Sequence, residues 1–159
     1  MKVVSKSVGD TLKLGRIIAK YLRKGDIVCL IGELGAGKTV LAKGIALGLG
    51  VKKNEIISPS FVLIRQYRRI KIPLYHFDLY RLNKIKDILD LGYEEYFYDA
   101  AITVIEWADK LKGYLPDEYL RIEITIKGKH IRIFKLDGFG GHYEDRLKVL
   151  FKILRQGIT

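Results

Sequence analysis

The spacing of hydrophobic and polar residues along the chain predicts strands that alternate with helices. Three short, mainly apolar runs predict strands, and the first, which is rich in β-branched residues, is typical of a strand buried on both faces of a parallel sheet. These runs occupy residues 26–31, 74–78 and 102–105. Residues 119–127 alternate apolar with polar side chains, and a second run at 131–134 follows Gly128. The last two segments therefore predict an antiparallel hairpin.

Other segments repeat their apolar residues at helical spacing. One helix is expected to start at the capping box Ser7-Val8-Gly9-Asp10 and to be ended by Gly25, and a second is expected to follow Thr39. Further helices are expected at 84–99, with a break near Gly92, and at 143–155, and further strands at 2–5 and 61–67. This order predicts an α/β fold with a mostly parallel central sheet, added antiparallel strands, and helices on both faces.

Residues 32–39 read Gly-Glu-Leu-Gly-Ala-Gly-Lys-Thr, the G-x-x-x-x-G-K-[ST] pattern of a phosphate-binding loop. In such a loop the backbone N–H groups point into one hollow that holds nucleotide phosphates. An ordinary glycine-rich turn is the alternative, but it does not explain the adjacent Lys38 and Thr39. We therefore predict a P-loop NTPase fold in which Lys38 reaches the terminal phosphates and Thr39 places its hydroxyl on Mg²⁺. The residues expected to contact the nucleotide here are Glu33, Leu34, Gly35, Ala36, Gly37, Lys38, Thr39 and Val40.

A phosphate-binding loop needs an acid that holds or orients the metal, and such an acid usually follows a neighbouring buried strand. Glu106 directly follows the run at 102–105, and Asp78 ends the run at 74–78. We predict that both are catalytic; the alternative is that each caps the next segment. Trp107, the only tryptophan, is expected to stack on a base or substrate, or to pack in the core. His76 alternates with Asp78 and is expected to be structural.

The composition indicates one globular domain over residues 1–159, with 137–159 as a C-terminal extension that contains a helix. The single cysteine, Cys29, is expected to be a small buried side chain in the strand before the loop. A lone cysteine forms no disulfide framework, no apolar run approaches the length of a membrane span, and no secretion signal is evident. We expect a soluble, cytoplasmic protein that does not bind membranes.

The net charge of +11 is high, and positive side chains cluster in several segments. These segments are 52–53, 65–71, 84–86 and 127–135. Such a field attracts nucleic acid or an acidic protein. A solvated, lysine-rich surface explains the same composition, so the charge alone does not identify a partner.

Several motifs follow one another along the chain. They are Ser58-Pro59-Ser60-Phe61, His76-Phe77-Asp78-Leu79-Tyr80-Arg81-Leu82, Leu91-Gly92-Tyr93, Ile105-Glu106-Trp107-Ala108 and Leu115-Pro116. Together with the phosphate-binding loop they resemble the bacterial TsaE (YjeE) family of small P-loop ATPases, over residues 3–127 or so. Many families share the loop, whereas His-Phe-Asp-Leu-Tyr-Arg followed by Glu-Trp is far more specific.

The resemblance implies a function that the motifs alone do not give. TsaE proteins act with the TsaD and TsaB subunits in forming threonylcarbamoyladenosine on tRNA, and their ATP hydrolysis supports repeated rounds by that complex. A contact of the basic surface with tRNA is a further expectation.

The resemblance also assigns roles to single residues. Lys38 binds the phosphates, Thr39 and Glu106 hold Mg²⁺, and Asp78 is the acid needed for hydrolysis. Trp107 matches the tryptophan near the nucleotide, and Thr11 lies in the segment near the base. Two positions depart from the family pattern. Ser60 stands where the family has threonine and keeps the hydroxyl; Glu33 stands where the family often has aspartate.

Two other functions remain open at this point. In a small-molecule or nucleotide kinase, Asp78 and Arg81 would act on the acceptor, and arginines at 65–71 would form a lid. In a nucleic-acid-binding module, the loop would only sense nucleotide. The chain has no recognisable RNA-binding motif, and its aromatic residues are not interleaved with its basic clusters.

Overall fold

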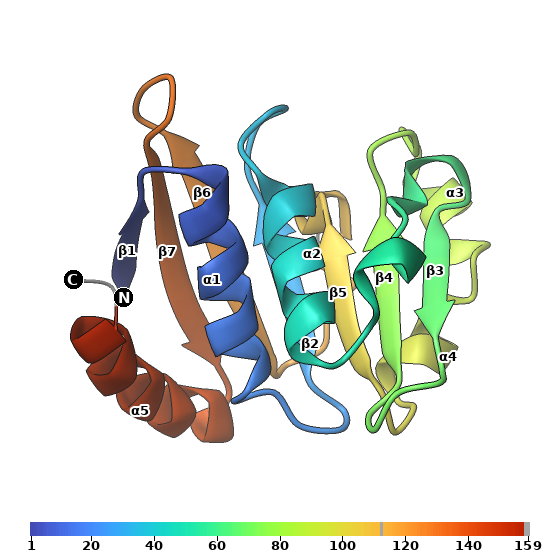
Figure 1. Cartoon of the computed structure of the whole chain (residues 1–159). Helices are drawn as coiled ribbons and strands as arrows, with labels where there is room; N and C mark the ends of the chain where they lie inside the picture. Colours follow the sequence, from blue (N-terminus) through green and yellow to red (C-terminus); the bar gives the residue numbers. More distant parts are fainter. Residues whose placement is uncertain (112, 158–159) are drawn as a thin grey trace.

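The centre of the molecule is a seven-stranded mixed sheet in the order β1-β7-β6-β2-β5-β4-β3 (Figure 1). The computed structural model describes residues 1–111 and 113–157. The strands are β1 (Lys2–Ser5), β2 (Ile27–Ile31), β3 (Ile64–Tyr67), β4 (Leu74–Asp78), β5 (Ile102–Glu106), β6 (Tyr119–Ile126) and β7 (Arg132–Phe139). Strands β6, β2, β5 and β4 run parallel, whereas β1, β7 and β3 pair antiparallel with their neighbours. The expected parallel sheet with added antiparallel strands is confirmed.

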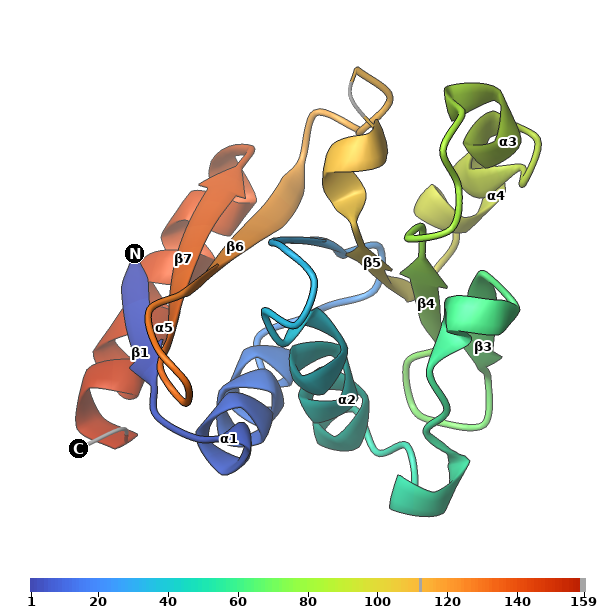
Figure 2. The same cartoon turned by 90° about the horizontal axis from the view of Figure 1, so that it is seen from above.

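Helices cover both faces of this sheet, as expected (Figure 2). They are α1 (Val8–Ala19), α2 (Lys38–Gly48), α3 (Ile85–Leu89), α4 (Tyr93–Phe97) and α5 (Gly141–Gly157). Short 3₁₀ turns occupy Lys53–Glu55, Pro59–Phe61 and Ala108–Leu111. Among the helices in the described part of the chain, none has the length and apolar character needed to cross a membrane.

Strand β2 contributes side chains to both layers of the core. Val28 and Leu30 lie in one apolar cluster with residues of α1 and α2, whereas Ile27 and Cys29 lie in a second cluster with residues of α3 and α4. Because successive side chains point to opposite faces, a strand covered on both faces must be apolar throughout. Burial raises the pKa of the Cys29 thiol far above its usual range, so this cysteine packs as a small apolar group, as expected.

Glycines let α1 and α2 lie almost backbone to backbone. A Cβ on Gly15 would come within 2.6 Å of the Leu41 carbonyl oxygen, and one on Gly44 within 2.6 Å of the Leu12 carbonyl oxygen. A Cβ on Gly48 would come within 2.5 Å of the Ala19 methyl group. Real Cβ atoms do not approach other atoms this closely, so these positions require glycine. The contact fixes α2, and with it the loop that precedes α2, against the rest of the molecule.

Helix α5 is anchored to the start of β2. The guanidinium of Arg146 donates two hydrogen bonds to the buried carboxylate of Asp26, at 2.7 and 2.8 Å. The Ile27 backbone N–H donates to the Tyr143 hydroxyl at 2.9 Å. Tyr143, Leu150 and Leu154 also join the apolar cluster of α1 and α2. The C-terminal segment, in which the sequence showed no motif, therefore holds the strand that leads into the phosphate-binding loop.

Several element boundaries differ from expectation. The strand expected at 61–67 begins at Ile64, because Pro59 starts a 3₁₀ turn and Leu63 takes a left-handed φ of 65°. The helix expected to continue to Gly25 ends at Ala19. The second hairpin strand does not stop at residue 134 but runs to Phe139, which pairs with Tyr119. The break expected near Gly92 is present: φ of 63° there separates α3 from α4.

The close contact of α1 with α2 predicts a large effect of one methyl group. Gly44→Ala is expected to lower the free energy of unfolding by about 1–3 kcal/mol, because the new Cβ forces the two backbones apart. Urea denaturation measures this change. Gly9→Ala is the control: it lies in α1, where a Cβ would meet only Ser7 Oγ at 3.6 Å, and there alanine's helix propensity should be stabilising. An equal effect of both changes would contradict the close contact.

The anchoring of α5 predicts that a substitution of Asp26 offsets part of the stability lost when Arg146 is substituted. Arg146→Met leaves the buried Asp26 carboxylate without its cation and is expected to cost about 2–4 kcal/mol of unfolding free energy. Adding Asp26→Asn to that variant should restore part of the loss, because no charge is then left unpaired. Lys148→Met is the control, since Lys148 pairs with Asp145, and both of these side chains are exposed. Equal costs for Arg146→Met and Lys148→Met would rule out this anchoring.

Candidate functional site

The phosphate-binding loop and both predicted acids meet at one edge of the sheet. Because β2, β5 and β4 run parallel, their carboxyl ends lie side by side, and Glu106 pairs in register with both Leu30 and Asp78. The loop that follows β2 therefore begins beside Glu106 and Asp78. In open α/β sheets ligands bind at this edge, outside the carboxyl ends of the strands.

The loop has the open, curved backbone that a phosphate group needs. Gly35 and Gly37 have φ of 77° and 105°, values that side-chain-bearing residues rarely adopt. A Cβ on either residue would meet no atom within 4 Å, so the space above the loop is open. Gly32 is different, because a Cβ there would lie 2.7 Å from the Ile124 carbonyl oxygen of β6. This glycine lets the start of the loop pack closely against the sheet.

Lys38 lies at the start of α2 and bends back over the loop. Its ammonium group donates to the carbonyl oxygens of Gly32 (2.6 Å) and Glu33 (2.9 Å), and it lies 3.6 Å from the centre of the Trp107 ring. Burial lowers the pKa of Lys38, and the negative charge of Glu106 is the main opposing effect. An anion beside the ammonium group favours its charged form in the same way. Lys38 is thus a buried cation that a phosphate group would stabilise.

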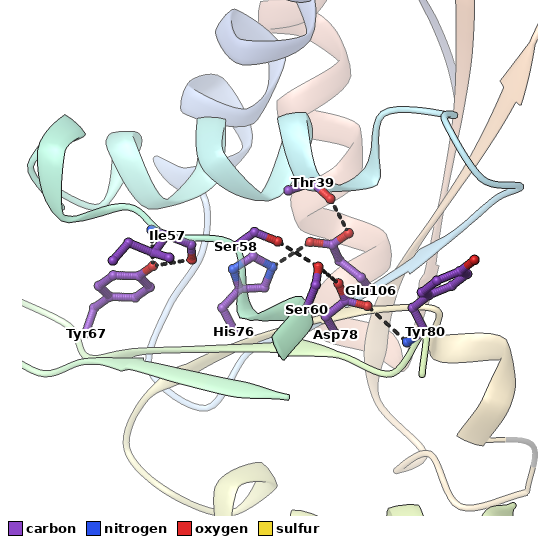
Figure 3. A network of polar contacts seen from close by, with 9 residues as sticks. All are labelled: Thr39, Ile57, Ser58, Ser60, Tyr67, His76, Asp78, Tyr80 and Glu106. Carbon is purple, nitrogen blue, oxygen red and sulfur yellow. Dashed lines mark hydrogen bonds and ion pairs between the residues drawn. The ribbon is translucent and has the colours of Figure 1, made fainter. Parts of the chain in front are cut away.

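The carboxylate of Glu106 is held between two donors (Figure 3). Thr39 Oγ1 donates to its Oε2 at 2.7 Å, and His76 Nε2 lies 2.8 Å from its Oε1. Because an ionised carboxylate only accepts hydrogen bonds, Nε2 of His76 carries the proton. Glu106 is 1% exposed and His76 2% exposed. The two carboxylate oxygens of Glu106 are therefore held in a fixed orientation, and the Thr39 hydroxyl lies beside them.

Asp78 joins a second set of polar contacts in the same view (Figure 3). Its Oδ2 accepts a hydrogen bond from Ser60 Oγ at 2.6 Å, and its Oδ1 accepts one from the Tyr80 backbone N–H at 3.0 Å. The hydroxyls of Ser58 and Ser60 lie 2.8 Å apart. This arrangement ties the segment 58–61 to an acid at the carboxyl end of β4. A group that replaced Ser60 at Asp78 would remove this contact of the segment with β4.

A cleft of about 460 Å³ connects these groups. Its lining consists of Leu34, Gly35, Gly37, Lys38, Thr39, Val40, Ser60, Phe61, Asp78, Tyr80, Arg81, Glu106 and Trp107. The Arg81 guanidinium lies over the Phe61 ring, 4.3 Å from its centre, and Phe61 is 81% exposed. Trp107 contacts Tyr80, with ring centres 5.1 Å apart, and has a left-handed φ of 61°. Trp107 and Phe61 therefore form walls of the cleft.

A second, smaller hollow of about 130 Å³ lies against the loop on a different side. It is lined by Ser7, Val8, Thr11, Gly35, Ala36, Gly37, Val40, Lys129, His130 and Arg132. Thr11 is buried there, with its hydroxyl 2.8 Å from Ser5 Oγ. The structure thus brings Thr11 to the loop, but not to the cleft that holds the two acids.

The donor set of the cleft suits a magnesium ion bound to phosphate. Mg²⁺ takes oxygen ligands, usually one or two from the protein and the rest from phosphates and water. The Thr39 hydroxyl and the Glu106 carboxylate are oxygen donors side by side, and the open loop lies next to both. Asp78 stands apart from this pair and contacts Ser60 instead. The geometry therefore distinguishes the acid beside the Thr39 hydroxyl from the acid held by Ser60 and the Tyr80 backbone N–H.

Most predicted site residues line the two hollows beside the loop. Glu33 is an exception: it lines neither hollow, and only its backbone carbonyl takes part by accepting from Lys38. Two features escaped the sequence reasoning. His76 was expected to be structural, but its direct contact with Glu106 was not predicted from its alternation with Asp78 along β4. The approach of Lys129, His130 and Arg132 to the loop had no local signal.

The contact between His76 and Glu106 predicts a stability effect. His76→Leu leaves a buried carboxylate oxygen without a donor and is expected to lower the free energy of unfolding by about 1–3 kcal/mol, as urea denaturation would show. His76→Gln keeps an N–H donor on a side chain of similar reach and should retain more stability. If both variants lose the same amount, packing of the ring rather than the hydrogen bond explains the effect.

The comparisons with known proteins agree with one another. A family model described as "Threonylcarbamoyl adenosine biosynthesis protein TsaE" matches residues 5–134. A protein of Treponema pallidum named tRNA threonylcarbamoyladenosine biosynthesis protein TsaE is 40% identical over 126 residues, which are 79% of this chain and 92% of that protein. The protein of the same name from Bacillus subtilis is 37% identical over 135 residues, 85% of this chain and 84% of its own.

A solved structure also resembles this chain over nearly its whole length. The crystal structure of YdiB from Bacillus subtilis superposes with a TM-score of 0.83 and 33% identity, over 96% of this chain and 94% of that one. This likeness extends beyond residue 134, where the family match ends. The strand–loop–helix unit and its two strand-end acids agree with the family model and with these relatives. The chain therefore belongs to the TsaE family.

Proposed function

We propose that this protein is a Mg²⁺-dependent ATPase that supports threonylcarbamoyladenosine formation on tRNA together with TsaD and TsaB. One observation carries the proposal: in a chain of the TsaE family, the phosphate-binding loop, Glu106 and Asp78 line a single cleft. The relatives from Treponema pallidum and Bacillus subtilis are named for the same tRNA modification. Cofactors of the proposed reaction are ATP and Mg²⁺.

In this mechanism the loop and Lys38 bind the phosphates. On binding, the Lys38 ammonium exchanges two backbone carbonyls for phosphate oxygens, which neutralise a charge that burial disfavours. Thr39 and Glu106 hold Mg²⁺, which when bound offsets charge on the β- and γ-phosphates. His76 keeps the Glu106 carboxylate in its orientation. These groups bind and position the nucleotide.

Asp78 has a different part in the proposed reaction. Its carboxylate accepts the hydrogen bond of the attacking water and so directs the water to the terminal phosphate. We infer that this water displaces Ser60, whose hydroxyl now donates to the Oδ2 of the same carboxylate. Hydrolysis would then be coupled to movement of the segment 58–61. Phe61 is exposed at the end of that segment, so a partner protein can contact it and respond to the movement.

The kinase alternative is less well supported by the geometry. Arg68, Arg69 and Lys71 lie in the turn between β3 and β4, at the amino end of β4, whereas Asp78 is at its carboxyl end. These basic residues do not line the cleft and so cannot close over an acceptor there without a rearrangement of the sheet edge. Arg81 does line the cleft but stacks on Phe61. Release of free phosphate, rather than a phosphorylated acceptor, distinguishes the ATPase.

The proposal predicts the effect of removing the phosphate-binding cation. Lys38→Ala is expected to reduce Mg²⁺-dependent ATP hydrolysis by about 10²-fold or more, because a preorganised positive charge beside the reacting phosphates is lost. Phosphate release with and without Mg²⁺ measures this. Lys43→Ala is the matched control: it removes a lysine from the same helix at a position that lines neither hollow. A Lys38→Ala variant as active as wild type would refute the ATPase site.

Reconstitution of the modification reaction tests the proposed role in threonylcarbamoyladenosine formation. A reaction with TsaD, TsaB, a threonylcarbamoyl donor and tRNA should stop after few rounds without this protein and continue when it is added. Asp78→Asn protein should bind ATP yet fail to sustain the reaction. Modification that proceeds through many turnovers without this chain would contradict the role. Salt-dependent binding of tRNA by the isolated chain would in addition support a direct contact with its basic surface.

A further inference from the structure

The cleft contains a cationic side chain to which the mechanism above gives no task. Among the described residues that line the cleft, the cations are Lys38 and Arg81. Lys38 is the first residue of α2, whereas Arg81 lies three residues beyond Asp78, the last residue of β4. The second cation is therefore on the side of the cleft where the proposed reaction has its attacking water.

An aromatic ring, and not an acid, holds the guanidinium of Arg81. The guanidinium carbon lies 4.3 Å from the centre of the Phe61 ring. Within residues 1–111 and 113–157, no carboxylate forms an ion pair with Arg81. Both side chains are exposed, and a cation–π contact at an exposed site is weak. A phosphate group accepts two parallel N–H bonds from a guanidinium and is the stronger partner, so it can take Arg81 from the ring.

The ring that holds Arg81 belongs to the segment that Asp78 holds. Ser60, the residue before Phe61, donates to the carboxylate of Asp78 at 2.6 Å (Figure 3). In the proposed reaction the attacking water displaces Ser60 from this acid. Because Phe61 is the next residue, a displacement of Ser60 also draws the ring away from Arg81. One short segment, 58–61, thus occupies both the acid and the cation on this side of the cleft.

We propose that Arg81 is a catalytic residue of the ATPase. Its guanidinium binds the terminal phosphate in the transition state, and its contact with Phe61 keeps it from the phosphate until the segment 58–61 moves. The inference rests on the proposed function, since it takes the cleft to hydrolyse ATP. A partner protein that contacts the exposed Phe61 ring would release Arg81 and so accelerate hydrolysis.

The guanidinium acts on charge that develops during the reaction. The oxygen of water forms a bond to the γ-phosphorus, and the bond from that phosphorus to the oxygen bridging the β- and γ-phosphates breaks, with its electron pair leaving on ADP. One proton of the water remains on the released phosphate and the other passes to solvent. Negative charge on the γ-phosphate oxygens and the bridging oxygen is offset by a guanidinium placed beside them.

Kinetics of phosphate release test the role of Arg81. Arg81→Ala is expected to lower kcat by about 10- to 10²-fold and to leave KM for ATP within about threefold, because the contact forms in the transition state. Arg69→Ala is the matched control: it removes an exposed arginine, in the turn between β3 and β4, that lines neither hollow. It should leave both constants unchanged. Arg81→Ala protein with the kcat of wild type would overturn the proposal.

Chemical rescue separates direct contact from a structural role. Millimolar guanidinium chloride, far below denaturing concentrations, should restore part of the kcat of Arg81→Ala, because the free ion can occupy the vacated position. Ammonium chloride at the same ionic strength should not, since ammonium lacks the planar pair of donors. A loss of kcat that guanidinium does not restore, or that ammonium restores equally, would contradict a direct guanidinium contact.

The holding contact has a separate test. Phe61→Leu keeps an apolar side chain but removes the ring, and it should raise kcat of the isolated chain by about two- to fivefold. In the Arg81→Ala background the same change should have no effect. Equal effects in both backgrounds, or a lower kcat for Phe61→Leu alone, would contradict the holding contact. Wild type that hydrolyses no ATP would refute the proposed function and this inference together, whereas hydrolysis that Arg81→Ala leaves intact would overturn this inference alone.

Discussion

The parallel register of β4, β5 and β2 is the constraint on which the site depends. Because the three strands run in one direction, three chain segments leave the sheet at the same edge. One becomes the phosphate-binding loop, and the other two end in Glu106 and Asp78. A change of direction in any one strand would carry its functional group to the opposite edge. The arrangement is held by burial on both faces, since all five residues of β4 and of β5 are buried.

Burial of charge at that edge creates the conditions for binding phosphate and metal. Glu106 and Asp78 are fixed by hydrogen bonds with the Thr39 hydroxyl, the His76 ring and the Ser60 hydroxyl. Lys38 is fixed by carbonyl oxygens and an aromatic ring. The carbonyl oxygens and the ring that hold Lys38 carry no net charge, so the lysine keeps a strong electrostatic interaction with an anionic ligand. In the proposed reaction the phosphates would supply negative charge beside Lys38, and Mg²⁺ would supply positive charge beside Glu106.

Much of this site could be predicted from local sequence, and the reason is physical. The loop pattern, the apolar strands and the acids that follow them are encoded within short segments, so residues 32–39, Glu106 and Asp78 were found without the structure. The start of β3 was misplaced because Leu63 adopts a left-handed conformation that its residue type does not favour. The Asp26–Arg146 pair and the Arg132–Gly35 contact join residues 120 and 97 positions apart. No spacing rule within a single element reveals such contacts.

The parts that local sequence did not reveal are those that hold the loop from its sides. Helix α1 supports α2 through glycines at Gly15 and Gly44, α5 holds the start of β2 through Asp26, and Arg132 grips the loop at Gly35. The sequence of a glycine-rich loop does not make the loop rigid, because each glycine increases the conformational freedom of the backbone. Its shape must therefore come from distant segments: Arg132 at the β6–β7 turn contacts the loop directly, α1 supports the helix that follows it, and α5 holds the start of the strand that precedes it.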